Sequence, residues 1–444
     1  MSKRISLVGS CFFLAVALVL PLHRATAATG SNGSTLYNFH GERAGDGAWP
    51  DGGLIADASG NFYGVTTAGG SSSTCDLSTY FYGCGTAYEV MPGTPWTEKV
   101  LYSFNGGTDG VNPLGQLVFD PAGNLYGVTP NGGSSCPESN LGCGVVFKLS
   151  PPTAEGGAWT ETILYSFHGG QDGANPQGGL ALDRSGNLYG VTFYGGGVSN
   201  CGGCGTVFKL TPPAEPGGAW TETILHRFGN AGDGWFPVGQ PVLDEHGNLY
   251  GTTGGGGSSK MGTVFQLRLA AKGGTVIERV IHTFMGVENG DGLSPAGGVT
   301  LHENKLYGVT RNGGTDIDCD NTFAGCGVAY ELEPPAQSGG EWSETLLLSF
   351  LPGPDGETPQ CAPVFDNSGN FYSVDEANWV DASNVFELSP PAQEGGSWTE
   401  TNLYSSATGT SGAGYPLVIT SGVIYGVAYG GGPSNDGLVF AVTP

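Results

Sequence analysis

The segment Leu101-Tyr102-Ser103-Phe104 decides the fold, because close copies of it return along the whole chain. Successive copies are 65, 63, 61, 56, 66 and 56 residues apart. A period of this length, filled with strand and turn signals, is typical of one structural unit repeated around a ring or along a solenoid. The seven copies occupy residues 36–39, 101–104, 164–167, 225–228, 281–284, 347–350 and 403–406.

Each repeat contains four strand-like stretches. In the third repeat these are residues 179–183, 187–192, 205–210 and 220–228, which are rich in β-branched and aromatic residues and are separated by Gly, Pro and Asp turns. The composition, with 81 glycines and 12% charged residues, also favours short strands and tight turns over helices. Four strands in one repeat indicate one blade of a β-propeller.

The two ends of the chain complement each other. The first strand, at residues 35–39, is of the fourth type in the repeat, and the last, at residues 438–442, is of the third type. If they pair, the ring closes without an open sheet edge. The predicted fold is therefore all-β: a seven-bladed β-propeller of four-stranded antiparallel blades, closed by the N-terminal strand that completes the last blade. A solenoid would instead carry distinct polar capping repeats at both ends.

The N-terminal residues 1–27 are predicted to be a secretory signal peptide. Lys3 and Arg4 precede an apolar run at residues 11–22, and Ala25-Thr26-Ala27 provides the small residues that a signal peptidase accepts. No other apolar stretch approaches the roughly 20 residues that span a membrane. Residues 28–444 then form a single propeller domain.

The chain is strongly acidic. Removal of the signal takes away three basic residues and no acidic ones, which leaves 12 basic and 40 acidic residues and a formal charge of −28. Nucleic acid is excluded as a partner, because its phosphates are bound by clustered Lys and Arg. The acidity is instead typical of the solvated surface of an exported protein, or of a cation-binding surface. The chain is predicted to be a monomer.

The repeat strings resemble a known family. Residues 124–129, Asn-Leu-Tyr-Gly-Val-Thr, a following Gly-Gly pair and the string Gly-Thr-Val-Phe-Lys-Leu at residues 205–210 are similar to the GloVer tandem repeats of bacterial extracellular proteins. The sixth repeat is degenerate, with Ser-Val-Asp at residues 373–375. The resemblance implies a fold and an extracytoplasmic location, with no established activity. Members carry C-terminal surface anchors, and because this chain stops at Pro444, it is expected to be freely secreted or periplasmic.

Eight cysteines fall in pairs between second and third strands, and each pair lies within one loop. A zinc site needs four converging ligands, so disulfides within each loop are favoured in an exported protein. A redox role for the Cys201-Gly-Gly-Cys204 pair lacks the helix N-terminus that would lower a thiol pKa. Cys361 is predicted to be a buried free thiol. The predicted disulfides are Cys75–Cys84, Cys136–Cys143, Cys201–Cys204 and Cys319–Cys326.

An Asp-Gly-x-x-Pro motif follows the fourth strand in six repeats, and the seventh copy, at residues 411–416, lacks the Asp. We call these segments the Asp-Gly connections. In one interpretation the Asp caps a tight turn and Pro fixes the start of the inner strand. In the other, the carboxylates ring one rim of the axial opening and bind Ca²⁺ or a polar ligand, with Trp49 and Trp235 as aromatic platforms. The candidate ligands are Asp46, Asp109, Asp172, Asp233, Asp291 and Asp355.

The sequence contains no convergent nucleophile or acid/base motif, no phosphate-binding loop and no metal-ligand helix. The favoured function is a secreted, non-catalytic binding module for a carbohydrate, Ca²⁺ or a partner protein at the rim that carries the Asp-Gly connections. A propeller hydrolase or lyase with its active site at the same rim, and a structural surface component, are the alternatives. No catalytic residue and no cofactor is predicted apart from Ca²⁺.

Overall fold

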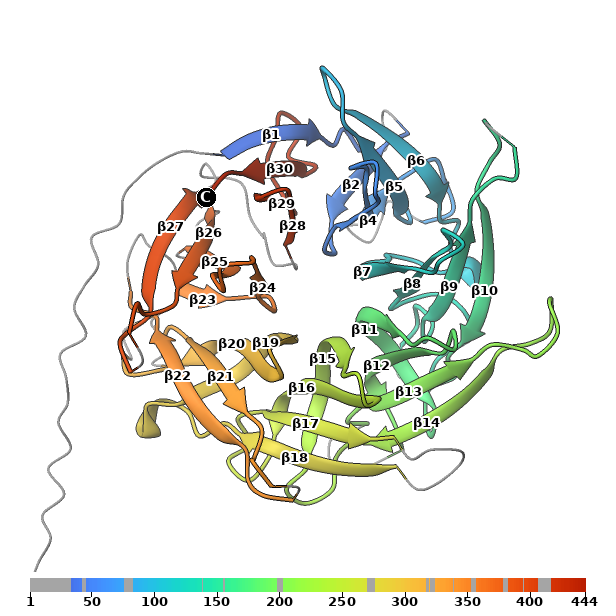
Figure 1. Ribbon diagram of the computed structural model, residues 1–444. Helices are drawn as coiled ribbons and strands as arrows, with labels where there is room; N and C mark the ends of the chain where they lie inside the picture. Colours follow the sequence, from blue (N-terminus) through green and yellow to red (C-terminus); the bar gives the residue numbers. More distant parts are fainter. Residues whose placement is uncertain are drawn as a thin grey trace, which may run out of the picture.

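The computed structural model consists of antiparallel β-sheets arranged around a central opening (Figure 1). In the described part of the chain, helical structure is limited to the 3₁₀ turns η3 (Gly107–Asp109) and η5 (Val287–Asn289). None of the described helical segments has the length and apolarity to cross a membrane. The predicted signal peptide lies outside the described residues. The structure describes residues 33–41, 45–75, 83–137, 139–154, 156–197, 203–269, 276–316, 319, 324–337, 339–352, 357–377, 382–393, 395–405 and 417–444.

Consecutive strands form four-stranded units, with the first strand nearest the central opening and the fourth at the outer edge (Figure 1). We name each unit by its outer strand. The β6 unit contains β2 (Gly47–Pro50), β3 (Ile55–Ala56), β4 (Phe62–Gly69), β5 (Thr86–Met91) and β6 (Thr97–Ser103). Here β2 and β3 both pair with β4 and together form the innermost strand, as β23 and β24 do in the β27 unit. The β10 unit contains β7 (Leu114–Phe119), β8 (Leu125–Thr129), β9 (Val145–Ser150) and β10 (Thr160–Ser166). The β14 unit contains β11 (Gly173–Leu182), β12 (Leu188–Gly195), β13 (Thr206–Thr211) and β14 (Thr221–Arg227).

The later units repeat this order. The β18 unit contains β15 (Gly234–Leu243), β16 (Asn248–Gly256), β17 (Thr263–Arg268) and β18 (Ile277–Thr283). The β22 unit contains β19 (Gly292–His302), β20 (Lys305–Gly313), β21 (Val328–Glu333) and β22 (Ser343–Ser349). The β27 unit contains β23 (Glu357–Pro359), β24 (Val364–Phe365), β25 (Phe371–Ala377), β26 (Ala382–Ser389) and β27 (Thr399–Ser405). The remaining strands are β1 (Gly33–Asn38), β28 (Val418–Thr420), β29 (Val423–Ala428) and β30 (Leu438–Val442).

The two ends of the chain meet in one sheet. The first strand, β1, pairs antiparallel with β30, and β30 continues to β29 and β28 (Figure 1). Elsewhere neighbouring units touch without sharing a sheet, except where a single parallel bridge from Gln240 to Gly298 links the β18 and β22 units. The architecture is propeller-like, as the four-strand repeat predicts.

The phenylalanine that ends six of the seven copies of the outer-strand segment packs against the next unit. Phe167, at the end of the β10 unit, meets Phe208 of β13 edge to face, with ring centroids 5.1 Å apart. Both rings are fully buried, and edge-to-face pairs add to the free energy gained by burial alone. The recurring segment is therefore the contact that joins one unit to the next. The same geometry holds for Phe39–Tyr88, Phe104–Phe147, Phe228–Phe265, Phe284–Tyr330 and Phe350–Phe386.

The inner strands approach so closely that a glycine is required where they touch. Gly178 has a left-handed φ of 74°, and a Cβ atom there would collide with the backbone of Gly239 in the next unit. Gly239 meets Gly297 in the same way, and Gly297 meets Cys361. Cys361 is a buried free thiol, as predicted, and burial raises its pKa to about 11. It is therefore protonated at neutral pH.

The Asp-x-x-Gly-Asn turns that follow the first strand in five of the repeats cap themselves. In the β14 unit, Asp183 accepts hydrogen bonds from the backbone of Ser185 and Asn187, from the Asn187 side chain and from the Tyr189 hydroxyl. Burial alone would raise the pKa of Asp183, but the hydrogen bonds from Asn187, Ser185 and Tyr189 outweigh it and lower that pKa. These acids are structural.

Three of the four predicted disulfides are present, Cys75–Cys84, Cys136–Cys143 and Cys319–Cys326. Cys204 is also disulfide-bonded, and Cys201 lies outside the described residues. The bonds indicate that the chain folds in an oxidising environment.

Replacing Phe167 by Ala should remove the contact between the β10 and β14 units and leave a cavity. We expect the free energy of unfolding to fall by about 3–5 kcal/mol, measured by urea denaturation. The control is Leu346→Ala on outer strand β22, where the side chain is 40% exposed, and its loss should stay below about 0.5 kcal/mol. Equal losses for the two variants would contradict this role for the aromatic pairs.

Replacing Asp183 by Ala should cost about 1–3 kcal/mol at pH 7, because four donors lose their acceptor. The folded-state pKa lies below the ordinary value of 3.8, so the carboxylate stabilises the fold above that value, and this contribution disappears as pH falls through the folded pKa. The difference between wild type and variant, measured by denaturation, should therefore shrink below about pH 4. Ser185→Ala, in the same turn, should have little effect at any pH. A pH-independent difference for Asp183→Ala would argue against a stabilising carboxylate.

Candidate functional site at the central opening

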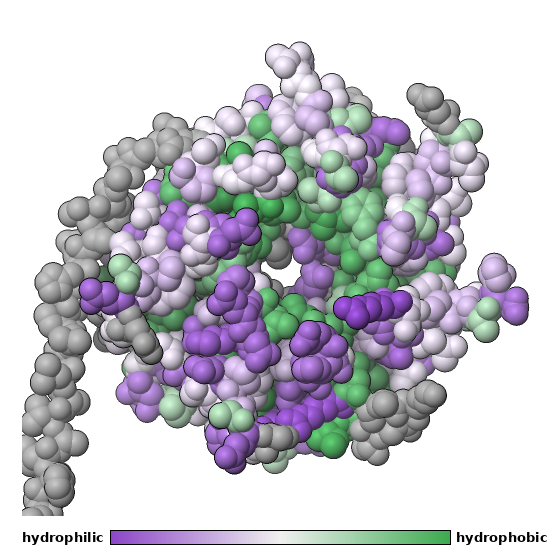
Figure 2. Space-filling view, viewed as in Figure 1, coloured by the Kyte–Doolittle hydropathy of each residue, from purple (hydrophilic) through white to green (hydrophobic). Residues whose placement is uncertain are grey.

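The inner strands enclose a pocket of about 520 Å³ on the axis. Figure 2 shows the central opening between the units from one face. The walls come from four inner strands, from two second-strand ends, at Arg311 and Tyr429, and from the residues directly after two Asp-Gly connections, Asp51 and Gln360. The polar side chains of the lining are Asp51, Gln116, Gln177, Gln240, Ser294, Arg311, Gln360 and Tyr429.

The lining residues occupy the positions at which the repeats differ. One set directly follows the proline of each Asp-Gly connection, where the repeats carry Asp51, Leu114, Gln177, Val238, Ala296 and Gln360. Arg311 and Tyr429 occupy another such position, which Pro130 and Phe193 take in other repeats. Neither set was singled out from the sequence. A comparison of the aligned copies for positions that vary beside invariant Pro and Gly would have found both.

The residue before each of these prolines has a left-handed backbone. Asn112, for example, has a φ of 58°, a conformation that costs a non-glycine residue about 1–3 kcal/mol. Its N–H donates to the carbonyl of Cys84, which belongs to the disulfide loop of the preceding unit, at 2.9 Å. Asn175 and Thr358 donate in the same way to Cys143 and Cys326. Each disulfide loop thus fixes the adjoining part of the pocket rim.

The amide side chains of the pocket are held in place. Gln116 donates to the Leu54 carbonyl at 2.8 Å, and Gln240 donates to the Leu180 carbonyl at 2.9 Å. Gln177 donates to Asn175. In contrast, the amide nitrogen of Gln360 is buried and has no hydrogen-bond partner. A buried donor without a partner is costly, and a ligand that accepts from it would remove that cost.

Aromatic rings stand beside the pocket. Trp49, predicted as a platform, stacks on the lining residue Tyr429 with ring centroids 5.6 Å apart and an interplanar angle of 20°. Phe236 and Phe193 stack in the same manner at 4.9 Å. Trp235, the other predicted platform, packs instead beside the apolar core around Phe228 and Phe265.

The described aspartates of the Asp-Gly connections are not among the residues that line this pocket. Asp109 accepts hydrogen bonds from the Tyr102 hydroxyl at 2.8 Å and from the backbone of Asn105. Asp46 and Asp172 each accept a hydrogen bond from the tyrosine hydroxyl of the outer strand that precedes their connection. This is the geometry of the turn-capping interpretation. Asp355 lies outside the described residues.

A glutamate of the following outer strand faces each of these three aspartates. Burial, followed by the charge of Asp46, raises the pKa of Glu98 to about 8, and burial with the charge of Asp109 does the same for Glu161. Glu222 beside Asp172 has its pKa raised to about 7, chiefly by burial. At neutral pH, Glu98 and Glu161 are therefore largely protonated, which avoids two like charges in one gap.

The chemistry available in the pocket is that of hydrogen bonding. Among the described residues that line it, Asp51 is the only carboxylate and no His or Cys is present. The pocket lining therefore offers hydrogen-bond donors and acceptors to a ligand.

Comparison with solved structures returns low sequence identities. A fungal alcohol oxidase of the AA5 family, in complex with copper, is 14% identical over 89% of this chain and 75% of its own, with a TM-score of 0.49. The Trypanosoma rangeli sialidase in complex with sialic acid is 12% identical over 94% of this chain and 60% of its own, with a TM-score of 0.43. A Dyadobacter fermentans protein of unknown function is 12% identical over 83% of this chain and 96% of its own, with a TM-score of 0.40.

No curated protein sequence matches this chain. A family model described as the Gloeobacter/Verrucomicrobia repeat matches residues 75–320 and 136–377, two overlapping segments that together extend over most of the chain. The match confirms the family predicted from the repeat strings.

Proposed function

This chain belongs to the Gloeobacter/Verrucomicrobia repeat family, and we propose that it is a secreted, monomeric, seven-bladed propeller that binds a carbohydrate in its axial pocket without catalysis. The blade count rests on the seven copies of the outer-strand segment. Closure rests on β1, which supplies an outer strand to the sheet of β28, β29 and β30. Export is supported by the disulfides and by the signal-like residues 1–27.

The observation that carries the binding proposal is the lining of the pocket. Four glutamine amides, a serine, a tyrosine and an arginine converge on one space of a size usual for small-ligand sites. Amide groups both donate and accept hydrogen bonds, which matches the hydroxyl groups of a sugar. The buried amide nitrogen of Gln360 has no hydrogen-bond partner, and a sugar oxygen would accept a hydrogen bond from it. Tyr429, backed by Trp49, offers a ring face on which a sugar can stack.

The Asp-Gly connections contribute to this site indirectly. Asp46 and Asp172 cap the turns that deliver Asp51 and Gln177 to the pocket, so the rim proposed from the sequence remains the proposed ligand face. The residues that would touch the ligand are those after the prolines.

We expect the double variant Gln177→Leu and Gln360→Leu to lose about 30-fold in affinity for the glycan that binds best on an array, because two hydrogen bonds of roughly 1 kcal/mol each disappear. Isothermal titration calorimetry measures the loss. The fold should survive, since Leu114 holds the same position in the β10 unit. The control is Gln337→Leu, an exposed glutamine outside the pocket lining.

Unchanged affinity in the double variant, or an array without any bound glycan, would contradict the proposal. Release of reducing ends from the bound glycan by the wild-type protein would replace the binding module with a hydrolase at the same site.

A further inference from the structure

Two outer strands carry a histidine at a position that is tyrosine in four of the seven copies. The residue that is Tyr37, Tyr102 or Tyr165 in three units donates its hydroxyl to the aspartate of the next Asp-Gly connection. In the β14 and β18 units this residue is His226 and His282. An imidazole nitrogen, which is a metal ligand, thus replaces a hydroxyl between two carboxylates.

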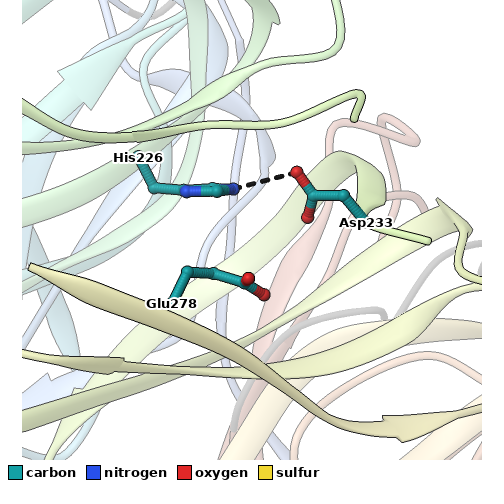
Figure 3. A group of neighbouring side chains, drawn as sticks. All are labelled: His226, Asp233 and Glu278. Atoms are coloured by element: carbon teal, nitrogen blue, oxygen red, sulfur yellow. Dashed lines mark hydrogen bonds and ion pairs between the residues drawn. The ribbon is translucent and has the colours of Figure 1, made fainter. Parts of the chain in front are cut away.

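The first of these gaps combines residues from two units. His226 of β14 and Asp233 of the following connection lie 3.0 Å apart, from Nε2 to Oδ2. Glu278 of β18, in the next unit, points at the same space (Figure 3). The three ligand atoms all lie within 4.8 Å of one another. The His226 and Asp233 side chains are 16% and 6% exposed, so the gap is nearly closed to solvent.

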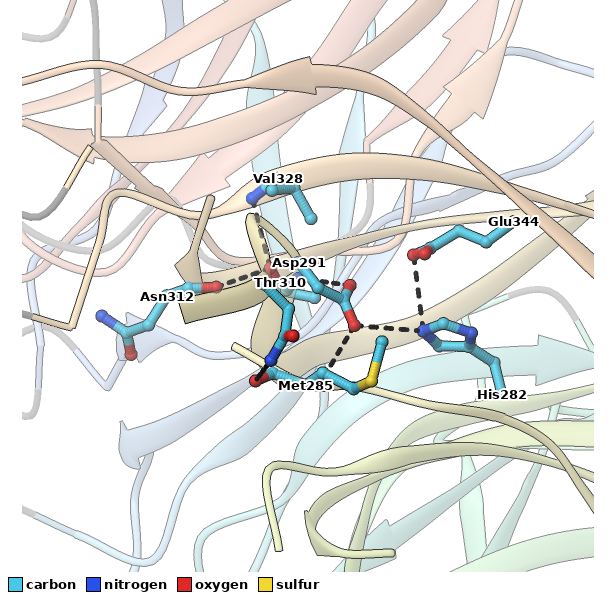
Figure 4. Close-up of polar contacts among 9 residues, drawn as sticks. His282, Met285, Asp291, Thr310, Asn312, Val328 and Glu344 are labelled. Carbon is cyan, nitrogen blue, oxygen red and sulfur yellow. Dashed lines mark hydrogen bonds and ion pairs between the residues drawn. The ribbon is translucent and has the colours of Figure 1, made fainter. Parts of the chain in front are cut away.

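The second gap repeats this arrangement one unit further on. His282 Nε2 lies 3.4 Å from Glu344 Oε1 and 3.8 Å from Asp291 Oδ2 (Figure 4). Asp291 is oriented by the backbone N–H groups of Met285, at 2.6 Å, and Gly292. Such hydrogen bonds typically orient a metal-binding carboxylate.

Three buried atoms in these gaps make no hydrogen bond, namely Oε1 of Glu278, Oε1 of Glu344 and Nε2 of His282. The last two face each other only as an ion pair, at 3.4 Å. The hydroxyl of Tyr330, a completely buried side chain on β21, is also unpartnered, and burial together with the charges of Glu344 and Asp291 raises its pKa. Buried polar atoms in a native fold ordinarily make hydrogen bonds, and an ion held between the histidine and the two carboxylates would interact with these atoms.

We propose that each gap binds one Zn²⁺ ion, through His226, Asp233 and Glu278 in one site and His282, Asp291 and Glu344 in the other. Tetrahedral ligands at zinc's usual bond lengths are about 3.4 Å apart, close to the measured separations. One imidazole and two carboxylates suit Zn²⁺, whereas Ca²⁺ takes six to eight oxygen ligands. A water would supply the fourth ligand.

Each ion would join two units, because the His and Asp come from one unit and its connection, and the Glu comes from the outer strand of the next. The two sites would thus tie together the β14, β18 and β22 units. They are separate from the axial pocket and do not depend on a carbohydrate.

The test uses the mature chain, stripped with EDTA and titrated with Zn²⁺ by calorimetry, with thermal unfolding followed in parallel. We expect two Zn²⁺ per chain and a rise of several degrees in Tm. His226→Tyr or His282→Tyr should each remove one ion, and the double variant should bind none. Tyrosine is the residue that four other outer strands carry here, so these variants should fold. His246→Tyr, at an exposed histidine, is the control and should still bind two ions.

A variant that gains a Zn²⁺ site controls for the possibility that the His→Tyr variants lose Zn²⁺ because they misfold. Tyr165→His would place an imidazole beside Asp172 and Glu222, as in the two natural gaps, and should raise the stoichiometry to three. The proposal is overturned if the wild type binds no more Zn²⁺ than the double variant, or if His246→Tyr loses as much as His282→Tyr.

Discussion

The structure depends on one contact repeated around the ring, the edge-to-face packing of an outer-strand aromatic ring on the third strand of the next unit. Phe167 on Phe208 is the clearest case. Because this contact lies well out from the axis, it sets the angle at which units meet. The inner strands then converge until backbone touches backbone, and Gly178 against Gly239 is the consequence. A bulkier residue would push the units apart and open the centre.

These constraints separate structural residues from the candidate functional ones. Residues that the unit needs, such as the aromatic pairs, the self-capping Asp183 turn and the glycines, recur in nearly every copy. Departures gather in two places: the axial lining, where Asp51 and Arg311 each occur once at their position in the repeat, and the gaps between outer strands, where His226 and His282 replace tyrosine. The disulfide loops link structural residues to the pocket lining. Their cysteine carbonyls accept hydrogen bonds from the backbone just before the prolines, and the lining residues follow those prolines.

Local features were predictable from the sequence, and contacts between units were not. Strands, turns and the Cys136–Cys143 bridge follow from residues close together in the chain. The pocket lining depends on how the first strands converge at the axis, which no single repeat encodes. Likewise, Glu344 of the β22 unit contacts His282 of the neighbouring β18 unit, and this contact depends on the angle between the two units. The carboxylates of the Asp-Gly connections were predictable as a set, but their position beside the outer strands depends on the same angle.

The central claim is that the ligand site is the axial pocket, built from the residues that follow the connection prolines. A crystal structure of the chain with its best-binding array glycan tests this most directly. We expect electron density for the glycan in the axial pocket, with an acceptor oxygen at the Gln360 amide nitrogen. A glycan bound to the outer strands, with the pocket free of it, would contradict the proposed binding site.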